Sequence, residues 1–438
     1  MVVRRALLIL FALAVVVGLS PASAPAARGA CVAGQPGPSC TVWTGKVVSV
    51  NDGDTLDVDV AYDGTSRASR VRITGIQAME QSAYGARGRQ GDCHAVEATQ
   101  RLEQLVRAGR RVVRLAAEDP ESRSRKRLKR TVAVRIRGRW RDAGSILLRE
   151  GRALWWPARV ESAPNVAYRE LGRQAIAFQR GLFDPDGCGL GPSSASPLKL
   201  WVNWDADGDD KVNPGGEWVA IKNLDPVNPV ALGGWYVRDT GLRRYTFPAE
   251  AAIAPGATVT LDVGGERNAE SPTVIDTAGQ TVFQWGLGYP VFANVTNDED
   301  ALGDGAYLFD PLGNVRAQML YPCRIGCYDP AQGTVAVSAD PLGRRESVTL
   351  TNLTAGAVDL EGYVLKRPPY SYHLGAGAVL PASGSIRVAV RGARENDTAL
   401  VKHWGLARSI LRAAGDAVRL STYTDLTLAC TAWGDRSC

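Results

Sequence analysis

The second half of the chain repeats itself once, and this repeat limits the folds that the chain can adopt. The same order of apolar and polar residues occurs in GEWVAIKNLDPVNPVALGGWYVRD (216–239) and in RESVTLTNLTAGAVDLEGYVLKR (345–367). After a turn with Pro and Gly, each copy continues into a short apolar run, TVTLDVG (258–264) or SIRVAVRG (385–392). Short runs separated by turns are typical of antiparallel β-sandwiches. We therefore expect two sandwich domains of about 120 residues each.

The length and composition of the chain indicate further domains. A chain of 438 residues is longer than one hydrophobic core usually serves. Its 47 glycines and 24 prolines favour short strands over long helices. LGPSSASP (190–197) has the composition of a linker. The predicted order is a signal peptide (1–30), a short segment (31–40), a front domain (41–188), a linker (189–197) and two sandwiches (198–328 and 333–438).

Residues 1–30 have the parts of a secretory signal peptide. Arg4 and Arg5 precede an apolar run (6–19), and Ala22-Ser23-Ala24 is an A-x-A cleavage site. The alternative, an uncleaved membrane anchor, needs a longer apolar run. We therefore expect an exported protein, secreted or held at the cell surface, with no membrane-spanning segment after the signal is removed.

The eight cysteines are an even number, which favours disulfides over metal thiolates in an oxidising compartment. Eight cysteines allow 105 pairings in principle. Six of them lie close together in sequence as three pairs, and two remain to bracket the front domain. The predicted bonds are Cys31–Cys40, Cys93–Cys188, Cys323–Cys327 and Cys430–Cys438.

Charge is distributed unevenly along the chain. Residues 41–190 hold 27 Lys and Arg against 18 Asp and Glu, whereas residues 191–438 hold 21 against 27. The front domain also carries a run of six basic residues within 123–130. Such a run is often a solvated loop, but beside a phosphate-binding site it attracts a nucleic-acid backbone.

The front domain alternates strands with three helices. VWTGKVVSVNDGDTLDVDVAY (42–62) has the alternation and the turn of a hairpin, and VRITGI (71–76) reads as a third strand. Val96, Leu102, Leu105 and Val106 recur at helical spacing within 94–108. Further strands are predicted at 112–117 and 131–136, and further helices at 145–150 and 166–180. We expect a small β-barrel with helices packed on it.

Residues 41–185 resemble the thermonuclease (staphylococcal nuclease-like) family, whose fold is an OB barrel with helices. No single motif carries the resemblance, and DGDT alone is a common hairpin turn. The order and spacing of the whole set carry it. The set comprises Asp52-Gly53-Asp54-Thr55, VRITGIQAME (71–80), HAVEATQRLEQL (94–105), KRTVAV (129–134), GSILLREGRA (144–153), Asn165, Tyr168 and Gly181-Leu182-Phe183.

This resemblance implies a catalytic set. In the family, carboxylates hold calcium, two arginines grip the phosphodiester and a glutamate activates or orients the attacking water. It implies Asp54 as a metal ligand and Glu80 as the base. Arg72 and Arg130 are implied as the clamps. The basic run beside them adds candidate substrate-binding residues, namely Arg125, Lys126, Arg127 and Lys129.

Two departures alter the set. Gln77 stands where the family has a second metal carboxylate, so it offers calcium only a carbonyl oxygen and one negative charge less. Leu128-Lys129 stands where the family has Tyr-Gly before the second clamp, so that arginine is either Arg127 or Arg130. We prefer Arg130, because Ala133 then follows three residues later, as in the family pattern.

The back half resembles the lamin tail domain family, an immunoglobulin-like sandwich, clearly at 198–322 and more weakly at 333–430. GEWVAIKN (216–223), LGGWYVRD (232–239), YTFP (245–248) and the Pro255-Gly256 turn carry the first match. The resemblance implies attachment or spacer modules with a cell-envelope or surface partner and no catalytic set. Four tryptophans are then core or sandwich-edge residues: Trp218, Trp235, Trp285 and Trp404.

A second calcium site is predicted at the start of the first sandwich. Oxygen-bearing residues alternate there as in a calcium loop, although Asp210 replaces the usual turn glycine and no flanking helices are predicted. A plain acidic turn is the alternative. The candidate ligands are Asp205, Asp207, Asp209, Asn213 and Glu217.

Two functions remain open at this point. The first is a secreted calcium-dependent endonuclease that hydrolyses extracellular DNA or RNA, with the sandwiches as attachment or spacer modules. The second is a non-catalytic, exported nucleic-acid-binding or adhesive surface protein that keeps a degenerate nuclease fold. Gln77 and Leu128-Lys129 motivate the second function.

Overall fold

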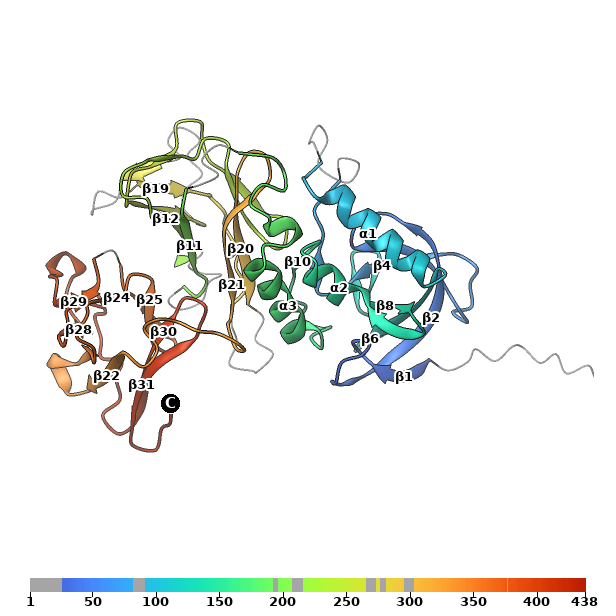
Figure 1. Ribbon diagram of the computed structural model, residues 1–438. Coiled ribbons are helices and arrows are strands. Elements are labelled where there is room, and N and C mark those ends of the chain that lie inside the picture. Colours follow the sequence, from blue (N-terminus) through green and yellow to red (C-terminus); the bar gives the residue numbers. More distant parts are fainter. Residues whose placement is uncertain are drawn as a thin grey trace, which may run out of the picture.

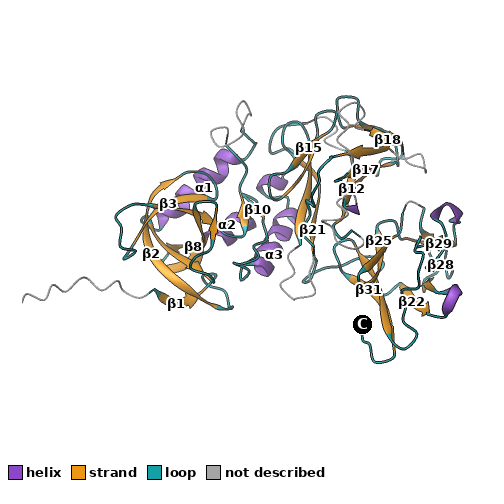
Figure 2. Cartoon of the chain, turned by 180° about the vertical axis from the view of Figure 1, so that it is seen from behind, coloured by secondary structure: helices purple, strands orange, loops and turns teal. Residues whose placement is uncertain are grey.

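The structure is a computed structural model that describes residues 26–81, 91–191, 196–206, 216–264, 273–275, 281–294, 303–375 and 377–438. The described part is mainly β and forms a barrel with helices, a first sandwich and a second sandwich (Figure 1). The first sandwich lies between the other two bodies in both views (Figures 1 and 2). This confirms the predicted fold class, a mainly β chain of several domains.

The front body is a closed five-stranded barrel. Its elements are β1 (Ala27–Ala30), β2 (Ser39–Val50), β3 (Thr55–Val60), β4 (Ser69–Ile73), β5 (Ile76–Gln77), α1 (Ala95–Ala108), β6 (Val112–Ala117), β7 (Arg123–Ser124), β8 (Arg127–Ile136), β9 (Arg139–Asp142), α2 (Ala143–Arg149), β10 (Leu154–Trp155) and α3 (Asn165–Ala177). The barrel strands follow the order β2-β3-β4-β8-β6, and β6 pairs back onto β2 to close it.

Alternating apolar residues on the strands fill the interior of the barrel. Leu56 and Val58 on β3 and Val71 and Ile73 on β4 are fully buried, because every second side chain points to the same face of a strand. The predicted hairpin at 42–62 corresponds to β2 and β3, and the three predicted helices correspond to α1, α2 and α3.

Two expectations differ in detail from the barrel. Val96 is 55% exposed, because α1 turns Ala95, Ala98 and Leu102 inward instead. Strand β1 pairs with Ser39–Val42, although residues up to 30 were assigned to the signal peptide. Cleavage after Ala24 would leave this strand intact. The rest of the predicted signal peptide, residues 1–25, lies outside the described residues.

Two buried polar side chains hold α3 against the barrel. Asn165 accepts from the Ala158 amide at 3.0 Å and donates to the Ala158 carbonyl at 2.8 Å. The hydroxyl of Tyr168 donates to Asp142 at 2.6 Å, and Asp142 also caps α2 by accepting from the Ser145 amide. Asn165 and Tyr168 belong to the set of residues that carries the resemblance to the thermonuclease family, and these bonds give both of them a structural role.

The first sandwich consists of two sheets. Its strands are β11 (Leu198–Asn203), β12 (Trp218–Asn223), β13 (Val230–Ala231), β14 (Tyr236–Asp239), β15 (Arg244–Thr246), β16 (Ala252–Ile253), β17 (Thr258–Asp262), β18 (Thr273–Ile275), β19 (Thr281–Gln284), β20 (Asp304–Phe309) and β21 (Val315–Tyr321). The main sheets have the orders β11-β12-β17-β19-β18 and β15-β14-β20-β21, and β17 pairs with β19 in parallel.

The second sandwich has the same strand order except that its described residues include no counterpart of β18. Its strands are β22 (Val335–Asp340), β23 (Ser347–Asn352), β24 (Val358–Asp359), β25 (Tyr363–Arg367), β26 (Tyr370–His373), β27 (Val379–Leu380), β28 (Ser385–Ala389), β29 (Val401–His403), β30 (Asp416–Thr422) and β31 (Thr427–Trp433). The sheets run β22-β23-β28-β29 and β26-β25-β30-β31, and β28 pairs with β29 in parallel.

Equivalent buried polar residues confirm that the sequence repeat is a structural repeat. Glu217 accepts from the Val291 amide at 2.7 Å, and Glu346 accepts from the Ile410 amide at 2.8 Å. Asn223 and Asn352 each donate to the carbonyl of the following loop at 2.7 Å. The glutamates therefore satisfy loop amides and the asparagines satisfy loop carbonyls, so each pair ties a strand to its loop in the same way.

The four predicted disulfides are all present. Cys31 is bonded to Cys40, Cys93 to Cys188, Cys323 to Cys327 and Cys430 to Cys438. The Cys93–Cys188 bond links the start of α1 to the end of the barrel domain and closes the longest loop, a separation of 95 residues. No helix in the described part of the chain is long and apolar enough to cross a membrane.

The barrel and the first sandwich share one hydrophobic core. Tyr236, Tyr307 and Phe309, on the outer face of the sheet containing β14 and β20, belong to the same cluster of buried residues as the barrel interior. The rings of Tyr236 and Phe309 stack at 4.9 Å. Arg316 donates to the Pro185 carbonyl at 2.7 Å across this boundary. A continuous core resists relative motion of the two bodies.

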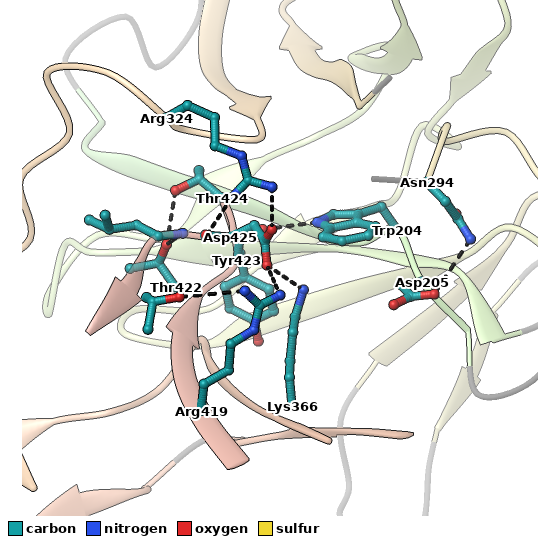
Figure 3. Close-up of polar contacts among 12 residues, drawn as sticks. Trp204, Asp205, Asn294, Arg324, Lys366, Arg419, Thr422, Tyr423, Thr424 and Asp425 are labelled. Atoms are coloured by element: carbon teal, nitrogen blue, oxygen red, sulfur yellow. Dashed lines mark hydrogen bonds and ion pairs between the residues drawn. The ribbon is translucent and has the colours of Figure 1, made fainter. Parts of the chain in front are cut away.

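The two sandwiches meet at an aromatic and charged interface (Figure 3). The indole of Trp204 donates to the Tyr423 carbonyl at 2.9 Å. Asp425 accepts from Arg324, Lys366 and Arg419 at 2.9–3.0 Å. Although burial favours the neutral acid, the charges of Lys366 and Arg419 lower the pKa of Asp425.

His373 lies in this interface without a charged partner. Its ring stacks on Tyr423 at 5.6 Å and meets the edge of Trp218 at 5.2 Å. Both ring nitrogens are buried and make no hydrogen bond to the described residues. Burial lowers the pKa of His373 to about 3, and the charges of Lys366 and Arg394 add to the effect. The fold therefore requires the neutral imidazole.

We predict that acid destabilises the protein through His373. The unfolded histidine titrates near pH 6.5, so this contribution to stability is complete above that pH. It is lost as the pH falls toward 3, at up to about 1.4 kcal/mol per pH unit. His373→Phe keeps the ring and should flatten the dependence of the free energy of unfolding on pH between 6.5 and 4. An equal slope in the parent and in His373→Phe would contradict the prediction.

Candidate functional site

A cavity lined mainly by residues of the barrel domain brings most of the predicted site residues together. Its volume is about 1040 Å³, and it is open to solvent. Five cationic side chains and three carboxylates face it: Arg70, Arg72, Arg125, Lys126, Arg127, Asp52, Asp57 and Glu80. Gln77 and the ring of Trp156 also line it. This mixture of cations around a few carboxylates suits an anionic substrate.

The Asp52-Gly53-Asp54-Thr55 turn between β2 and β3 forms the floor of the site. The Asp54 amide donates to Asp52 at 2.9 Å and closes the turn. A Cβ on Gly53 would lie 2.6 Å from the Cβ of Ala78 and 2.7 Å from that of Ala98, so only glycine lets the turn pack this closely. The Asp54 side chain is 2% exposed and accepts from Arg72, from the Thr55 hydroxyl and from the Ala78 amide at 2.9–3.0 Å.

Arg72 links this turn to the segment that carries Gln77 and Glu80. It is 5% exposed and donates to Asp54 at 3.0 Å and to the side-chain carbonyl of Gln77. The amide nitrogen of Gln77 then donates to Glu80 at 3.1 Å. The guanidinium also lies 4.8 Å from the ring centre of Trp156. Gln77 therefore connects the predicted clamp to the predicted base.

The pKa values of two carboxyl groups in the cavity are raised. Burial and the charge of Asp54 raise the pKa of Asp52 to about 7. Burial and the same charge raise the pKa of Glu80, and the charge of Arg72 opposes that shift. The three carboxyl groups thus repel one another, and a cation between them would relieve the repulsion.

The basic run folds into a hairpin at the rim of the cavity. Arg123 pairs with Leu128 and Ser124 with Arg127, which leaves Arg125 and Lys126 at the tip. Arg127 reaches inward and donates to the Thr55 hydroxyl at 3.4 Å. Burial and the nearby charge of Arg72 lower the pKa of Arg127.

Lys129 lines a neighbouring cavity of about 320 Å³. Arg72, Ser124 and Trp156 line both cavities, so the two adjoin along these residues. Burial, set against the charge of Glu161, lowers the pKa of Lys129. The four residues implied as substrate-binding therefore lie along one continuous basic surface.

The structure places Arg130, the preferred second clamp, away from this cavity. Arg130 donates to the carbonyls of Pro120, Ser122 and Lys129 and stacks 4.7 Å from the ring centre of Trp43. It does not line the cavity that holds Arg72 and Glu80. The reason is strand alternation: β4 and β8 run in parallel with Arg72 opposite Lys129, so positions 127 and 129 share the face of Arg72 and position 130 does not. Arg127, the alternative from the sequence, lines the cavity together with Arg72 and Glu80.

The calcium set implied by the sequence fits only in part. Asp52, Asp54 and Glu80 supply the carboxylates that a hard cation prefers. Gln77 does not fit as a ligand in this arrangement, because its carbonyl oxygen accepts from Arg72 and its amide nitrogen donates to Glu80. Asp52, which the resemblance did not assign, faces the cavity, whereas Asp54 lies behind it.

Other candidate metal ligands lie elsewhere in the chain. Cys93, His94 and Cys188 lie within 4.8 Å of one another, but the two sulfurs form a disulfide and are not thiolate ligands.

Of the predicted calcium loop, Asp207, Asp209 and Asn213 lie outside the described residues. Asp205 accepts from Asn294 at 3.4 Å. Glu217 is fully buried and binds loop amides inside the sandwich, so its carboxylate is part of the fold.

Sequence reasoning missed three parts of the site. The sequence analysis treated Asp52 only as part of a turn. Its position two residues before Asp54 could have indicated that a second carboxylate faces the site. Trp156 was not singled out, and only the fold brings its ring over Arg72. Gly241 and Leu242 come from the first sandwich and line the cavity, which no local pattern predicts.

The geometry of the first sandwich agrees with a comparison to known families. Residues 202–322 match the Lamin Tail Domain. The lamin tail domain thus spans β12 to β21 and the end of β11, within the predicted range 198–328. The described residues of the second sandwich share its strand order apart from β18. No curated protein matches the chain.

We predict that Gln77→Glu destabilises the protein when calcium is absent. The change replaces the donor that faces Glu80 at 3.1 Å with a negative charge and should cost about 1–3 kcal/mol of unfolding free energy. Calcium should restore much of this loss, because the new carboxylate is a better cation ligand. Thermal unfolding with calcium and with chelator measures both effects. Gln332→Glu, at an exposed position, is the control, and an unchanged midpoint in chelator would show that Gln77 does not bridge Arg72 and Glu80.

Proposed function

We propose that the protein is an exported endonuclease that hydrolyses phosphodiester bonds of DNA or RNA with calcium as its cofactor. One observation carries the proposal: Arg72, Arg127 and Glu80 line a single cavity on a closed barrel. The resemblance of residues 41–185 to the thermonuclease family supports it, since that family uses two arginines and a glutamate for this reaction. The basic front domain supports it further.

The two arginines would stabilise the phosphate as it gains charge. Arg72 is held from one side by Asp54 and Gln77, while its Nε makes no hydrogen bond to the described residues. Arg127 makes only a long bond to Thr55, so its guanidinium can turn to a phosphate oxygen. Planar guanidinium groups bind pairs of phosphate oxygens, and they are already in place before the reaction.

Glu80 would accept the proton of the attacking water. Its pKa is raised by burial and by Asp54, which brings the carboxylate closer to the basicity that a general base needs. The bond from Gln77 fixes the direction of the carboxylate. Asp52 and Glu80, which line the cavity, would hold calcium, and the ion would supply Lewis-acid stabilisation of the phosphoryl oxygen and lower the pKa of bound water.

All of the proposed contacts are to phosphate, so base specificity should be weak. The four disulfides suit an oxidising compartment, and the predicted signal peptide supports export. The first sandwich lies between the second sandwich and the barrel that carries the cavity (Figure 1). The second sandwich is therefore the better candidate for attachment to a surface partner.

We predict that cleavage requires calcium and Glu80. Purified protein should fragment single- and double-stranded nucleic acid with calcium and not with excess chelator. Glu80→Gln should lower turnover by about 10²–10⁴-fold, because the amide cannot take the proton. Glu97→Gln, on the exposed face of α1, should cleave like the parent. Full activity of Glu80→Gln would remove Glu80 from the mechanism.

We predict that Arg127 matters more than Arg130 for turnover. Arg127→Ala should lower kcat by about 10²–10³-fold, since it removes a charged donor from the cavity. Arg130→Ala should mainly lower the unfolding midpoint, because its guanidinium satisfies buried carbonyls away from the cavity. Single-turnover rates and thermal unfolding of both variants measure the contrast. The opposite order of effects on kcat would favour Arg130 as the clamp.

A second function is favoured by the Gln77 network. An amide at position 77 leaves the site one carboxylate short, and the protein would then bind nucleic acid through the basic surface without cutting it. Binding should weaken steeply with salt. Salt-sensitive retention with no fragments under any divalent ion would support this function, and calcium-stimulated fragments would exclude it.

A further inference from the structure

We infer that the lamin tail domain is a working part of the cavity: Arg238 positions the segment that carries Glu80, and the Gly241–Leu242 turn forms a wall that substrate must pass. The inference rests on the proposed function for the role of Glu80. It assigns the lamin tail domain a part in the reaction, where the resemblance implied only attachment or spacing.

Arg238 projects from β14 into the boundary with the barrel. It is 1% exposed, and its Nη1 contacts the sulfur of Met79 at 3.5 Å and Asp92 at 3.9 Å. Its Nη2 is buried without a hydrogen-bond partner among the described residues. A buried guanidinium is costly unless a carboxylate is near, so Asp92 is its electrostatic partner.

Asp92 links Arg238 to the backbone of Glu80. The Asp92 carboxylate accepts from the Glu80 amide at 3.3 Å, and the Asp92 amide donates to the Glu80 carbonyl at 2.8 Å. Arg238, Asp92 and the Glu80 backbone thus form a chain of contacts from one domain to the other. Arg238 does not reach the cavity itself, so it is a positioning residue.

The turn after β14 reaches the cavity directly. Gly241 and Leu242 line it together with Arg72, Gln77 and Glu80. Leu242 has φ +80°, a conformation that favours glycine, so the leucine side chain is kept here at a conformational cost. The apolar side chain of Leu242 at the edge of the cavity narrows the opening of the cavity beside the charged groups.

The repeat shows that this turn is particular to the first sandwich. Strands β25 and β26 of the second sandwich are joined by Pro368-Pro369 alone, whereas four residues (240–243) join β14 and β15. Lys366 holds the position equivalent to Arg238 and likewise faces the preceding body, where it lies 4.1 Å from the ring centre of Trp204. Both sandwiches therefore dock through the same sheet face, but only the first adds a turn that enters a cavity.

The test uses the full chain and two substitutions. Arg238→Gln should lower kcat about tenfold with little change in KM, and Arg238→Lys should recover part of the loss. Hydrogen exchange of the Glu80 amide should become faster in Arg238→Gln. Lys366→Gln removes the equivalent buried cation and should change neither kcat nor that exchange rate. All variants are measured well below their unfolding midpoints.

The second substitution, Leu242→Gly, fits the φ of this position and should not harm folding. It should change KM for nucleic acid several-fold at constant kcat, while Leu353→Gly, at an exposed loop position of the second sandwich, should not. Parent-like exchange in Arg238→Gln together with a parent-like KM in Leu242→Gly would overturn the inference. Absence of cleavage by the parent would instead refute the proposed function, and the exchange measurement would still decide the role of Arg238.

Discussion

The buried ion pair between Arg72 and Asp54 joins the parts on which the site depends. Asp54 comes from the turn between β2 and β3, and Arg72 comes from the middle of β4. Burying two charges is costly, and the pair is tolerated here because both groups make further hydrogen bonds. Those bonds extend to Thr55, Gln77 and Ala78. The position of Glu80 follows from them, because Gln77 holds its carboxylate and Ala78 lies on the same segment.

The three bodies are joined in series by one docking mode. In each sandwich, the outer face of the sheet containing β14 or β25 packs against the body before it. Tyr236 and Phe309 enter the barrel core, and Val364 and Tyr423 enter the core of the first sandwich. A buried cation accompanies the apolar contact each time, Arg238 in one interface and Lys366 in the other. Because these faces are continuous with the cores, the sandwiches act as extensions of the barrel and not as loosely tethered modules.

Much of the fold could be predicted because it depends on local patterns. The hairpin around Asp52 and Asp54, the three helices and the repeat all follow from apolar periodicity and turn residues. The disulfides followed from closeness in sequence for three pairs and from elimination for the fourth. The motif spacing favours Arg130 as the second clamp, whereas strand alternation turns this residue away from the cavity that holds Arg72. The residues of β8 that share the face of Arg72 depend on the register between β4 and β8, and this register cannot be read from a single sequence.

The sequence by itself indicated the class of each domain, the candidate residues for binding phosphate and the four cysteine pairs that the structure contains. These depend on residue type and on spacing along the chain. Only the tertiary structure decided which arginine faces Glu80, that the Gln77 amide bridges Arg72 and Glu80, and that Leu242 of another domain borders the cavity. The physical reason is that these contacts join residues far apart in sequence, so they exist only after the barrel has closed and the lamin tail domain has packed on its outer surface.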